Sequence, residues 1–228
     1  MKELGNVLIT GGASGLGAAV VDAVAEHGGT PLVLDRAVPS GPVKHACVDL
    51  ADRRAAEHAV QELAAAVGGL DAVFTAAGID SCGALGEVPT AAWERVIEVN
   101  LLGTAAVVRA ALPYLERSRG TVVTCASTLG VNAVGDATAY CASKFGIVGF
   151  SRALAAETKG RVGVTMLVPG GMRTAFFDGR DPRYQPAADA KLNDPEHVAR
   201  AVVFAMRQPA GCEIREMVVC HSEETSWP

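Results

Sequence analysis

The sequence has few aromatic residues, no run of basic residues and no long apolar segment. Aromatic residues make up 5% of the 228 residues, and the formal net charge is −5. An acidic chain without Lys or Arg clusters lacks the positive surface that binds a nucleic-acid backbone or an anionic membrane. The apolar stretch near the N-terminus, at 7–10, is too short for a signal peptide or a membrane span. We therefore expect a cytoplasmic protein that binds a small molecule, with neither nucleic acid nor membrane as a partner.

The cysteines lack the spacing of a metal site or of a disulfide framework. No two of the six form a Cys-x-x-Cys pair, and a chain of this size does not need disulfides to fold. Cys141 adjoins Tyr140 and resembles a nucleophile in that respect, but no histidine lies in a matching motif. We predict no metal, and free, mostly buried thiols at Cys47, Cys82, Cys125, Cys141, Cys212 and Cys220.

A linker that would divide the chain is also absent. No Pro/Ser-rich stretch or abrupt change of composition occurs, half of the residues are hydrophobic, and 25 are glycine. These values suit a compact protein with many tight strand-to-helix turns. We predict one domain over residues 1–228.

Short β-branched runs alternate with longer amphipathic stretches, which is typical of repeated βα units around a parallel sheet. The continuous apolar runs indicate strands buried on both faces, and thus a doubly wound α/β fold with helices on both sides of the sheet. An irregular loop at about 174–193 breaks the alternation and is of a kind that often covers an active site. We predict strands at 7–10, 31–35, 45–50, 72–76, 121–127, 162–168 and 216–220, and helices at 15–27, 53–67, 91–116, 140–158 and 195–207.

A glycine-rich turn follows the first predicted strand and opens the first predicted helix. The segment reads Thr-Gly-Gly-Ala-Ser-Gly-Leu-Gly over residues 10–17. Backbone N–H groups and the positive end of a helix at such a turn can hold a pyrophosphate. These glycines could also form an ordinary turn, but the strand before and the helix after favour dinucleotide binding. The candidate residues are Gly11, Ser14, Gly15, Leu16 and Gly17.

An acidic residue, Asp35, ends the second predicted strand, eighteen residues after Gly17. A carboxylate at this place accepts hydrogen bonds from the adenosine ribose and repels a 2′-phosphate, so we predict NAD as the cofactor. The alternative is NADP, because the adjacent Arg36 can tolerate a phosphate.

Tyr140 and Lys144 lie four residues apart, on one face of a predicted helix. A phenol with an ordinary pKa of about 10 needs a nearby cation if it is to exchange a proton near neutral pH. Tyr-x-x-x-Lys alone is a weak motif, since such pairs are common on helix surfaces.

In order and spacing, motifs across nearly the whole chain closely resemble those of the classical short-chain dehydrogenase/reductase family. The resemblance implies a seven-stranded Rossmann sheet and hydride transfer to or from a nicotinamide. The motifs are residues 10–17, Asp35, Asp49, Ala76-Ala77-Gly78, Asn100, Ser127, Tyr140 with Lys144, and Pro169-Gly170-Gly171-Met172-Arg173-Thr174.

The resemblance also assigns roles to four catalytic candidates. Ser127 would hydrogen-bond the substrate oxygen, and Tyr140 would give a proton to it or take one from it. Lys144 would bind the nicotinamide ribose and favour the phenolate, while Asn100 would anchor a water that links Lys144 to solvent. Further cofactor-binding candidates are Asp49 at adenine, Thr174 at the carboxamide, and Leu50, Ala77, Gly78, Pro169, Gly170 and Met172.

The chain departs from the family pattern at two positions. Thr75 stands where an asparagine is usual, and Met172 stands where a smaller aliphatic residue is usual. We expect a mainly apolar substrate pocket, with no arginine assigned to a substrate carboxylate. Its expected lining is Ala126, Thr128, Val134, Gly171, Met172, Phe176, Phe177 and Tyr184.

The resemblance implies a homodimer or homotetramer assembled through the helices at 91–116 and 140–158. Trp227 is costly to leave in water, so we expect it to pack against the body or a neighbouring subunit. The sequence thus predicts an NAD(H)-dependent oxidoreductase that interconverts a secondary alcohol and a ketone. The alternatives are an NADPH-dependent ketoreductase and a noncatalytic NAD-sensing protein.

Overall fold

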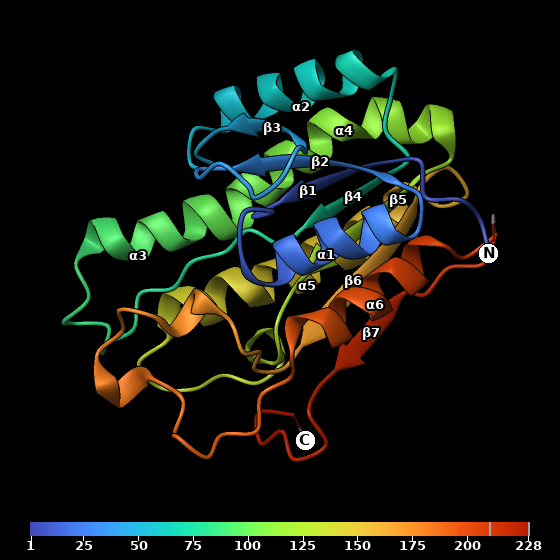
Figure 1. Cartoon of the computed structure of the whole chain (residues 1–228). Coiled ribbons are helices and arrows are strands. Elements are labelled where there is room, and N and C mark those ends of the chain that lie inside the picture. The colour runs from blue at the N-terminus through green and yellow to red at the C-terminus, as the bar shows by residue number, and fades with distance from the viewer. Residues whose placement is uncertain (210, 228) are drawn as a thin grey trace.

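The computed structural model describes residues 1–209 and 211–227, which form a seven-stranded parallel sheet covered by helices (Figure 1). The strand order is β3-β2-β1-β4-β5-β6-β7. This doubly wound sheet confirms the predicted fold class. The strands are β1 (Asn6–Thr10), β2 (Thr30–Asp35), β3 (Lys44–Cys47), β4 (Ala72–Thr75), β5 (Thr121–Cys125), β6 (Gly163–Pro169) and β7 (Glu216–Val219).

Alternate residues of the strands are buried on opposite faces of the sheet, because strand side chains have a period of two. Helices α1 (Gly15–Glu26) and α6 (Pro195–Met206) pack on the face that carries Ile9 and Phe74. The face that carries Leu8 and Val73 is covered by α2 (Arg53–Val67), α4 (Thr104–Ser118) and the end of α5 (Thr138–Glu157). Helices therefore cover both faces of the sheet, which leaves the ends of the strands as the place where a ligand can bind.

The strand order reverses between β1 and β4, which are neighbours in the sheet although β2 and β3 lie between them in the chain. Helices that follow β1 and β4 lead away to opposite faces, so a crevice opens beyond the carboxyl ends of these strands. The glycine-rich turn after β1 lies at this crevice.

The helix predicted at 91–116 is not uniform. It consists of α3 (Thr90–Ile97), one π-helical turn η1 (Glu98–Gly103) and α4. A π turn inserts extra residues into a helix and is frequent at functional sites. Hydrophobic periodicity does not reveal such an insertion. Asn100 lies inside this turn.

Other strands and helices begin or end a few residues away from their predicted bounds. The strands predicted to end at 50 and 127 end at Cys47 and Cys125, and Ser127 instead caps the short 3-10 helix η2 (Thr128–Gly130). The loop predicted at 174–193 is mostly irregular, with two further 3-10 helices, η3 (Ala175–Phe177) and η4 (Pro182–Tyr184).

The prediction of mostly buried cysteines is wrong. Only Cys125 and Cys141 are buried, whereas Cys47 and Cys212 are exposed and the remaining two are partly exposed. The exposed pair lies on edge strand β3 and beyond the end of α6, where the apolar helices no longer cover the chain.

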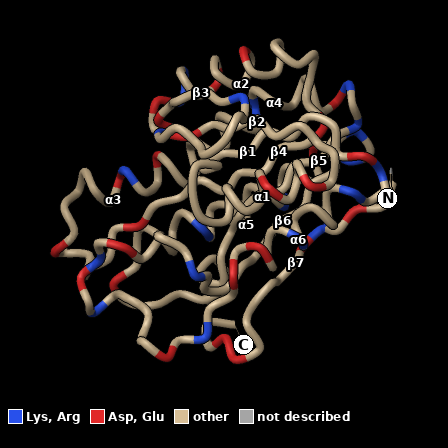
Figure 2. The backbone as a smooth tube through the Cα atoms, viewed as in Figure 1, with Lys and Arg blue, Asp and Glu red and all other residues tan. Residues whose placement is uncertain are grey.

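Acidic and basic residues are interspersed around the periphery of the fold (Figure 2). Among the described residues, one helical segment, Thr90–Ser118, is long and apolar enough to cross a membrane by length and composition. Its most apolar window is 56% buried inside the protein, because α4 packs against the sheet and α2. The segment is thus a core helix of the fold.

Candidate active site

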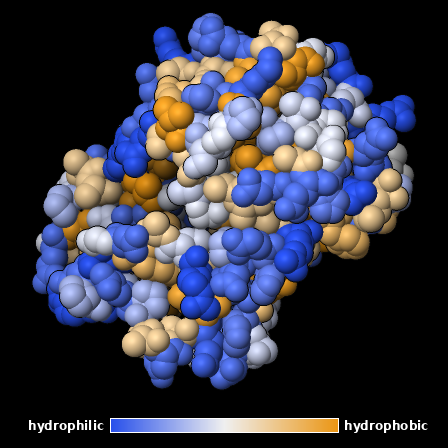
Figure 3. All heavy atoms as spheres, viewed as in Figure 1, coloured by the Kyte–Doolittle hydropathy of each residue, from blue (hydrophilic) through white to orange (hydrophobic). Residues whose placement is uncertain are grey.

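A cleft of about 900 Å³ opens beyond the carboxyl ends of the strands. This volume is at the upper end of the range for sites that hold small molecules and cofactors. The glycine-rich turn and Asp35 line one side, and the loop at 174–193 and the C-terminal segment line the other. Figure 3 shows one face of the molecule, which is mostly hydrophilic and has a hollow flanked by hydrophobic residues.

At two glycines of the turn, a side chain would be strained or would clash with the backbone. Gly11 has a φ of 70°, a conformation that favours glycine, and a Cβ at Gly17 would lie 2.1 Å from the backbone oxygen of Gly11. Ser14 precedes α1 without capping it through its side chain, so the first N–H groups of the helix remain free for a ligand. Such a turn is a backbone cradle for an anion.

Asp35 lies at the end of β2 with its carboxylate fixed by two backbone groups. The carboxylate accepts hydrogen bonds from the N–H groups of Ala13 and Ala37, each at 3.0 Å. Since a carboxylate has about four acceptor positions, it can accept further bonds from a ligand. Asp35 and Arg36 both line the cleft.

Asp49 lines the cleft, and its carboxylate is held by two groups of the protein. It forms an ion pair with Arg95 and accepts a hydrogen bond from the N–H of Ala51. Partial burial is the largest single influence and would raise the pKa of Asp49, but the hydrogen bonds from Arg95 and Ala51 and the charges of Arg95 and Arg36 together place that pKa below its ordinary value. Arg95 also lines the cleft and was missed in the sequence, because it comes from α3, far along the chain from Asp49.

Ser127, Tyr140 and Lys144 meet in the same cleft. Ser127 and Lys144 are buried, with 8% and 4% of their surfaces exposed. The ammonium Nζ of Lys144 donates a hydrogen bond to the backbone oxygen of Cys125 at 2.9 Å and lies 5.5 Å from the centre of the Tyr140 ring. Tyr140 and Lys144, which are four residues apart in the sequence, therefore also lie close together in the structure.

The protonation of Tyr140 differs from the expectation. Burial raises the pKa of Tyr140 above its ordinary value, and the hydrogen bond with Ser127 opposes this shift without cancelling it. Burial also lowers the pKa of Lys144. Desolvation by burial is the largest influence on the pKa of Tyr140, so Tyr140 holds its proton at neutral pH.

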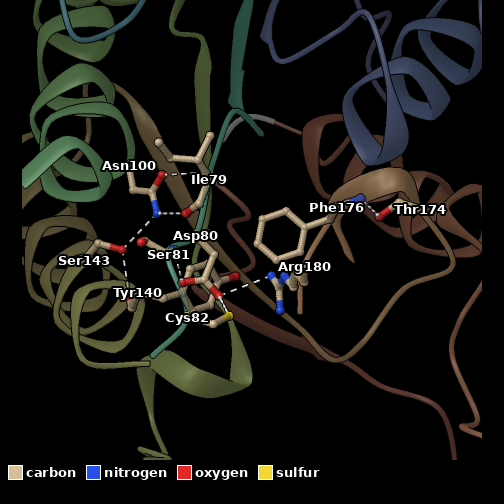
Figure 4. A network of polar contacts seen from close by, with 10 residues as sticks. All are labelled: Ile79, Asp80, Ser81, Cys82, Asn100, Tyr140, Ser143, Thr174, Phe176 and Arg180. Carbon is tan, nitrogen blue, oxygen red and sulfur yellow. Dashed lines mark hydrogen bonds and ion pairs between the residues drawn. The ribbon is translucent and has the colours of Figure 1, made fainter. Parts of the chain in front are cut away.

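Asn100 fastens the segment after β4 to α5 (Figure 4). Its side chain accepts a hydrogen bond from the N–H of Ile79 at 2.8 Å and donates to the oxygen of Ile79 at 2.9 Å and to Ser143 at 3.0 Å. A Cβ at Gly78 would lie 3.5 Å from Oδ1 of Asn100 and 3.6 Å from Nζ of Lys144. The π turn thus brings Asn100 beside Lys144.

Thr75, which stands where an asparagine is usual in the family, is the last residue of β4. Its hydroxyl is buried without a hydrogen-bond partner among the described residues. The loop after β4 is held instead by Thr10, whose hydroxyl accepts a hydrogen bond from the N–H of Ala77 at 3.1 Å. Thr10 is a contact that the sequence analysis did not assign.

The remaining cofactor candidates Ser14, Gly15, Leu16, Leu50, Ala77, Pro169, Gly170, Met172 and Thr174 all line the cleft. Thr174 lies beside Gly15, where an added Cβ would meet it at 3.4 Å. This contact joins the loop after β6 to the glycine turn.

The expected substrate lining is correct except at Val134. Val134 lies outside the cleft and is 50% exposed, because the segment after η2 turns away into solvent. The other seven residues line the cleft. An arginine, Arg180, also lines it, although the sequence analysis assigned none to the substrate.

The C-terminal segment forms part of the substrate side. Glu224 accepts a hydrogen bond from the N–H of Gly171 at 2.9 Å, and the hydroxyl of Ser226 lies 2.7 Å from that of Thr128. Trp227 is partly buried on the cluster that contains Ile147, which confirms the prediction that it packs against the body. In the sequence, only Trp227 indicated that the C-terminal segment contacts the body of the protein.

Residues 5–185 match the family model described as short chain dehydrogenase. The chain belongs to the short-chain dehydrogenase family. It is accordingly an oxidoreductase, of a family that binds a nicotinamide cofactor. The free backbone of the glycine turn and the carboxylate of Asp35 fit such a cofactor.

Relatives of this short-chain dehydrogenase include a dehydrogenase named for its substrate and an uncharacterized oxidoreductase. It is similar to L-fucose dehydrogenase of Mus musculus, with 29% identity over 97% of this chain and 89% of the relative. An uncharacterized oxidoreductase of Staphylococcus aureus is 29% identical over 93% of this chain and 95% of its own.

Solved structures share the fold. The aldohexose dehydrogenase of Thermoplasma acidophilum has a TM-score of 0.87 at 22% identity, over 96% of this chain and 93% of its own. An alcohol dehydrogenase from Thermococcus sibiricus, complexed with 5-hydroxy-NADP, has a TM-score of 0.86 at 23% identity, over 95% and 96% of the two chains.

Proposed function

We propose that this short-chain dehydrogenase interconverts a secondary alcohol and a ketone with NAD(H), with Tyr140 as the general acid and base. The observation that carries the proposal is the meeting of Tyr140, Ser127 and Lys144 in the cleft that the glycine turn also lines. A noncatalytic NAD-sensing protein would have no need to retain both Tyr140 and Lys144.

The catalytic side chains have different tasks. Ser127 holds the substrate oxygen by a hydrogen bond, and Tyr140 gives that oxygen a proton during reduction or takes one during oxidation. Because burial keeps Tyr140 protonated in the free protein, the chain is set for proton donation. Lys144 binds the nicotinamide ribose and favours loss of the Tyr140 proton during oxidation. The bound nicotinamide supplies or accepts the hydride.

Asn100 acts through Lys144. We propose that it anchors a water beside the ammonium, so that the proton of Tyr140 can be replaced from solvent. Its buried position next to Gly78 and Lys144 supports this role.

The preference for NAD over NADP is proposed from Asp35. A carboxylate at the end of β2 accepts hydrogen bonds from ribose hydroxyls and repels a 2′-phosphate. Arg36 and Arg95 also line this part of the cleft and would favour that phosphate, so NADPH-dependent reduction is the second candidate.

Assembly as a homodimer or homotetramer in the cytoplasm is also proposed. Two large apolar residues support an interface on the proposed helices. Leu102 in η1 is 40% exposed and Phe145 in α5 is 45% exposed.

The cofactor proposal is tested by titrating NADH and NADPH against the protein and the variant Asp35→Ala, with fluorescence of the bound nucleotide as the signal. We expect the parent to bind NADH more tightly by about tenfold or more, and the variant to lose that preference, because one close charge contributes roughly 1–3 kcal/mol. Tighter binding of NADPH by the parent would contradict the proposal.

The reaction is tested with the preferred cofactor and a panel of secondary alcohols and ketones that includes sugars, since the mouse relative is named for one. The expected result is formation of NADH with at least one alcohol. A protein that binds NADH but turns over no member of the panel would favour the noncatalytic alternative.

A further inference from the structure

The substrate side of the cleft contains a partly buried ion pair. Arg180, from the loop between η3 and η4, lies with Nη2 3.2 Å from Oδ2 of Asp80, which follows β4 (Figure 4). The side chains are 16% and 7% exposed, and both residues line the cleft. A pair so far removed from water differs from the exposed ion pairs on the same loop, such as Arg183 with Asp181.

Aromatic rings hold the guanidinium of Arg180 near the catalytic tyrosine. Its Cζ lies 4.6 Å from the ring centre of Phe176 and 4.8 Å from that of Phe177. The ring of Phe176 in turn lies 5.7 Å from that of Tyr140. The guanidinium is thus one ring away from the phenol that exchanges the proton.

The donors of this guanidinium are largely unused. Among the hydrogen bonds of the described residues, none has a side-chain nitrogen of Arg180 as donor, and its Nη2 is buried without a hydrogen-bond partner although Asp80 lies close by. Nη2 faces Asp80 and is closed to solvent, so the donors that remain for a ligand are Nε and Nη1. A ligand in the cleft can accept hydrogen bonds from them.

The charges around Arg180 oppose an anionic ligand. Asp80 lies beside the guanidinium, and three further acidic residues, Asp178, Asp181 and Glu224, line the cleft. A substrate carboxylate or phosphate would meet these negative charges in a poorly solvated site. A neutral hydroxyl group, by contrast, can accept a hydrogen bond from Arg180 and donate one to Asp80.

Asp80 has acceptor capacity for such a hydroxyl. Its Oδ1 accepts from the N–H of Ser81 at 2.7 Å, and its Oδ2 accepts from the thiol of Cys82 at 3.3 Å. These contacts fix the carboxylate and leave lone pairs free. The pair therefore offers donors and acceptors side by side, which suits two adjacent hydroxyl groups.

We propose that Arg180 and Asp80 form a subsite for hydroxyl groups next to the reacting carbon, so that the substrate is a neutral vicinal diol or a larger polyol. The inference rests on the proposed function, since it names the substrate class of the same cleft. Arg180 donates to one substrate hydroxyl, Asp80 accepts from it or from its neighbour, and Phe176 keeps the guanidinium in place beside Tyr140.

The test compares three substrates of one skeleton: cyclohexanol, vicinal cyclohexanediol, and the hydroxycyclohexane carboxylate with its groups on adjacent carbons. The parent should show the highest kcat/KM on the diol. Arg180→Met should lower kcat/KM on the diol by at least about tenfold, because the variant has no donor for the second hydroxyl. It should change kcat/KM on cyclohexanol by less than about threefold, because cyclohexanol lacks that hydroxyl. Asp80→Asn should act in the same direction, and Arg183→Met is the matched control on the same loop.

Three results would overturn the proposal. These are a preference for the carboxylate, equal losses on the diol and cyclohexanol in Arg180→Met, and an equal loss in Arg183→Met. Melting temperatures of the variants show whether a loss reflects folding, and Asp80→Asn provides the second variant if Arg180→Met does not fold.

Failure of the proposed function is distinguishable from failure of the subsite. If the parent oxidises none of the three substrates, binding of vicinal cyclohexanediol to the parent with NADH is measured by saturation-transfer NMR. A signal that is lost in Arg180→Met and kept in Arg183→Met supports the subsite without turnover. An absent or unchanged signal contradicts it.

Discussion

The two sides of the cleft are built in different ways. The cofactor side consists of strand ends and of backbone packed on backbone, as at Gly11 and Gly17. The substrate side is assembled from irregular segments far apart in the chain, as where Ser226 contacts Thr128 across 98 residues. A site made of short motifs is encoded locally and is specific to a family, whereas a site made of distant loops can differ from one member to the next.

The strongest test of the cofactor side is Gly17→Ala. The new Cβ would lie 2.1 Å from the oxygen of Gly11, so the turn must shift. Overpacking of this kind is worth about 1–3 kcal/mol, which corresponds to roughly ten- to hundredfold weaker binding of NADH. Nucleotide fluorescence measures the affinity, and a melting curve shows whether the fold is retained.

Gly86→Ala is the matched control for that variant, because nothing lies within 4 Å of its added Cβ. It should bind NADH as the parent does. Unchanged NADH affinity in Gly17→Ala would mean that the turn does not hold the cofactor.

A smaller effect is expected on the substrate side from Trp227→Ala. Trp227 is half-buried on Ile147 and its neighbours, so the truncation should lower the free energy of unfolding by about 1–3 kcal/mol. Because the tryptophan packs on its own chain, the loss should not depend on protein concentration in thermal melts.

Trp227→Phe keeps most of the apolar contact and should recover most of that stability. A melting temperature that falls only on dilution would assign Trp227 to a neighbouring subunit instead. A melting temperature equal to that of the parent would contradict the packing altogether.

The sequence could predict that the glycine turn and Asp35 meet at one cleft, because their determinants are local. Gly11, Gly17 and Asp35 occupy fixed places relative to β1, α1 and β2, and the periodicity of the strands and helices supplied that frame. Tyr140 and Lys144 were found for the same reason, since one helical turn separates them.

The substrate side could not be predicted in the same way. The partners Arg180 and Asp80 meet only through the path of an irregular loop. Val134 was wrongly assigned because apolar character alone does not say which way a loop turns. The raised pKa of Tyr140 also escaped prediction, because it depends on how completely the fold excludes water.

The central claim is that Tyr140 transfers the proton, and Tyr140→Phe with the turnover of the best alcohol tests it most directly. Tyr114→Phe, which removes a hydroxyl from a partly buried ring of α4 that packs against the core, is the control. Since general acid and base catalysis contributes about 10²- to 10⁴-fold, we expect Tyr140→Phe to lose that much of kcat while NADH binds as in the parent. A Tyr140→Phe protein as active as Tyr114→Phe would contradict the account.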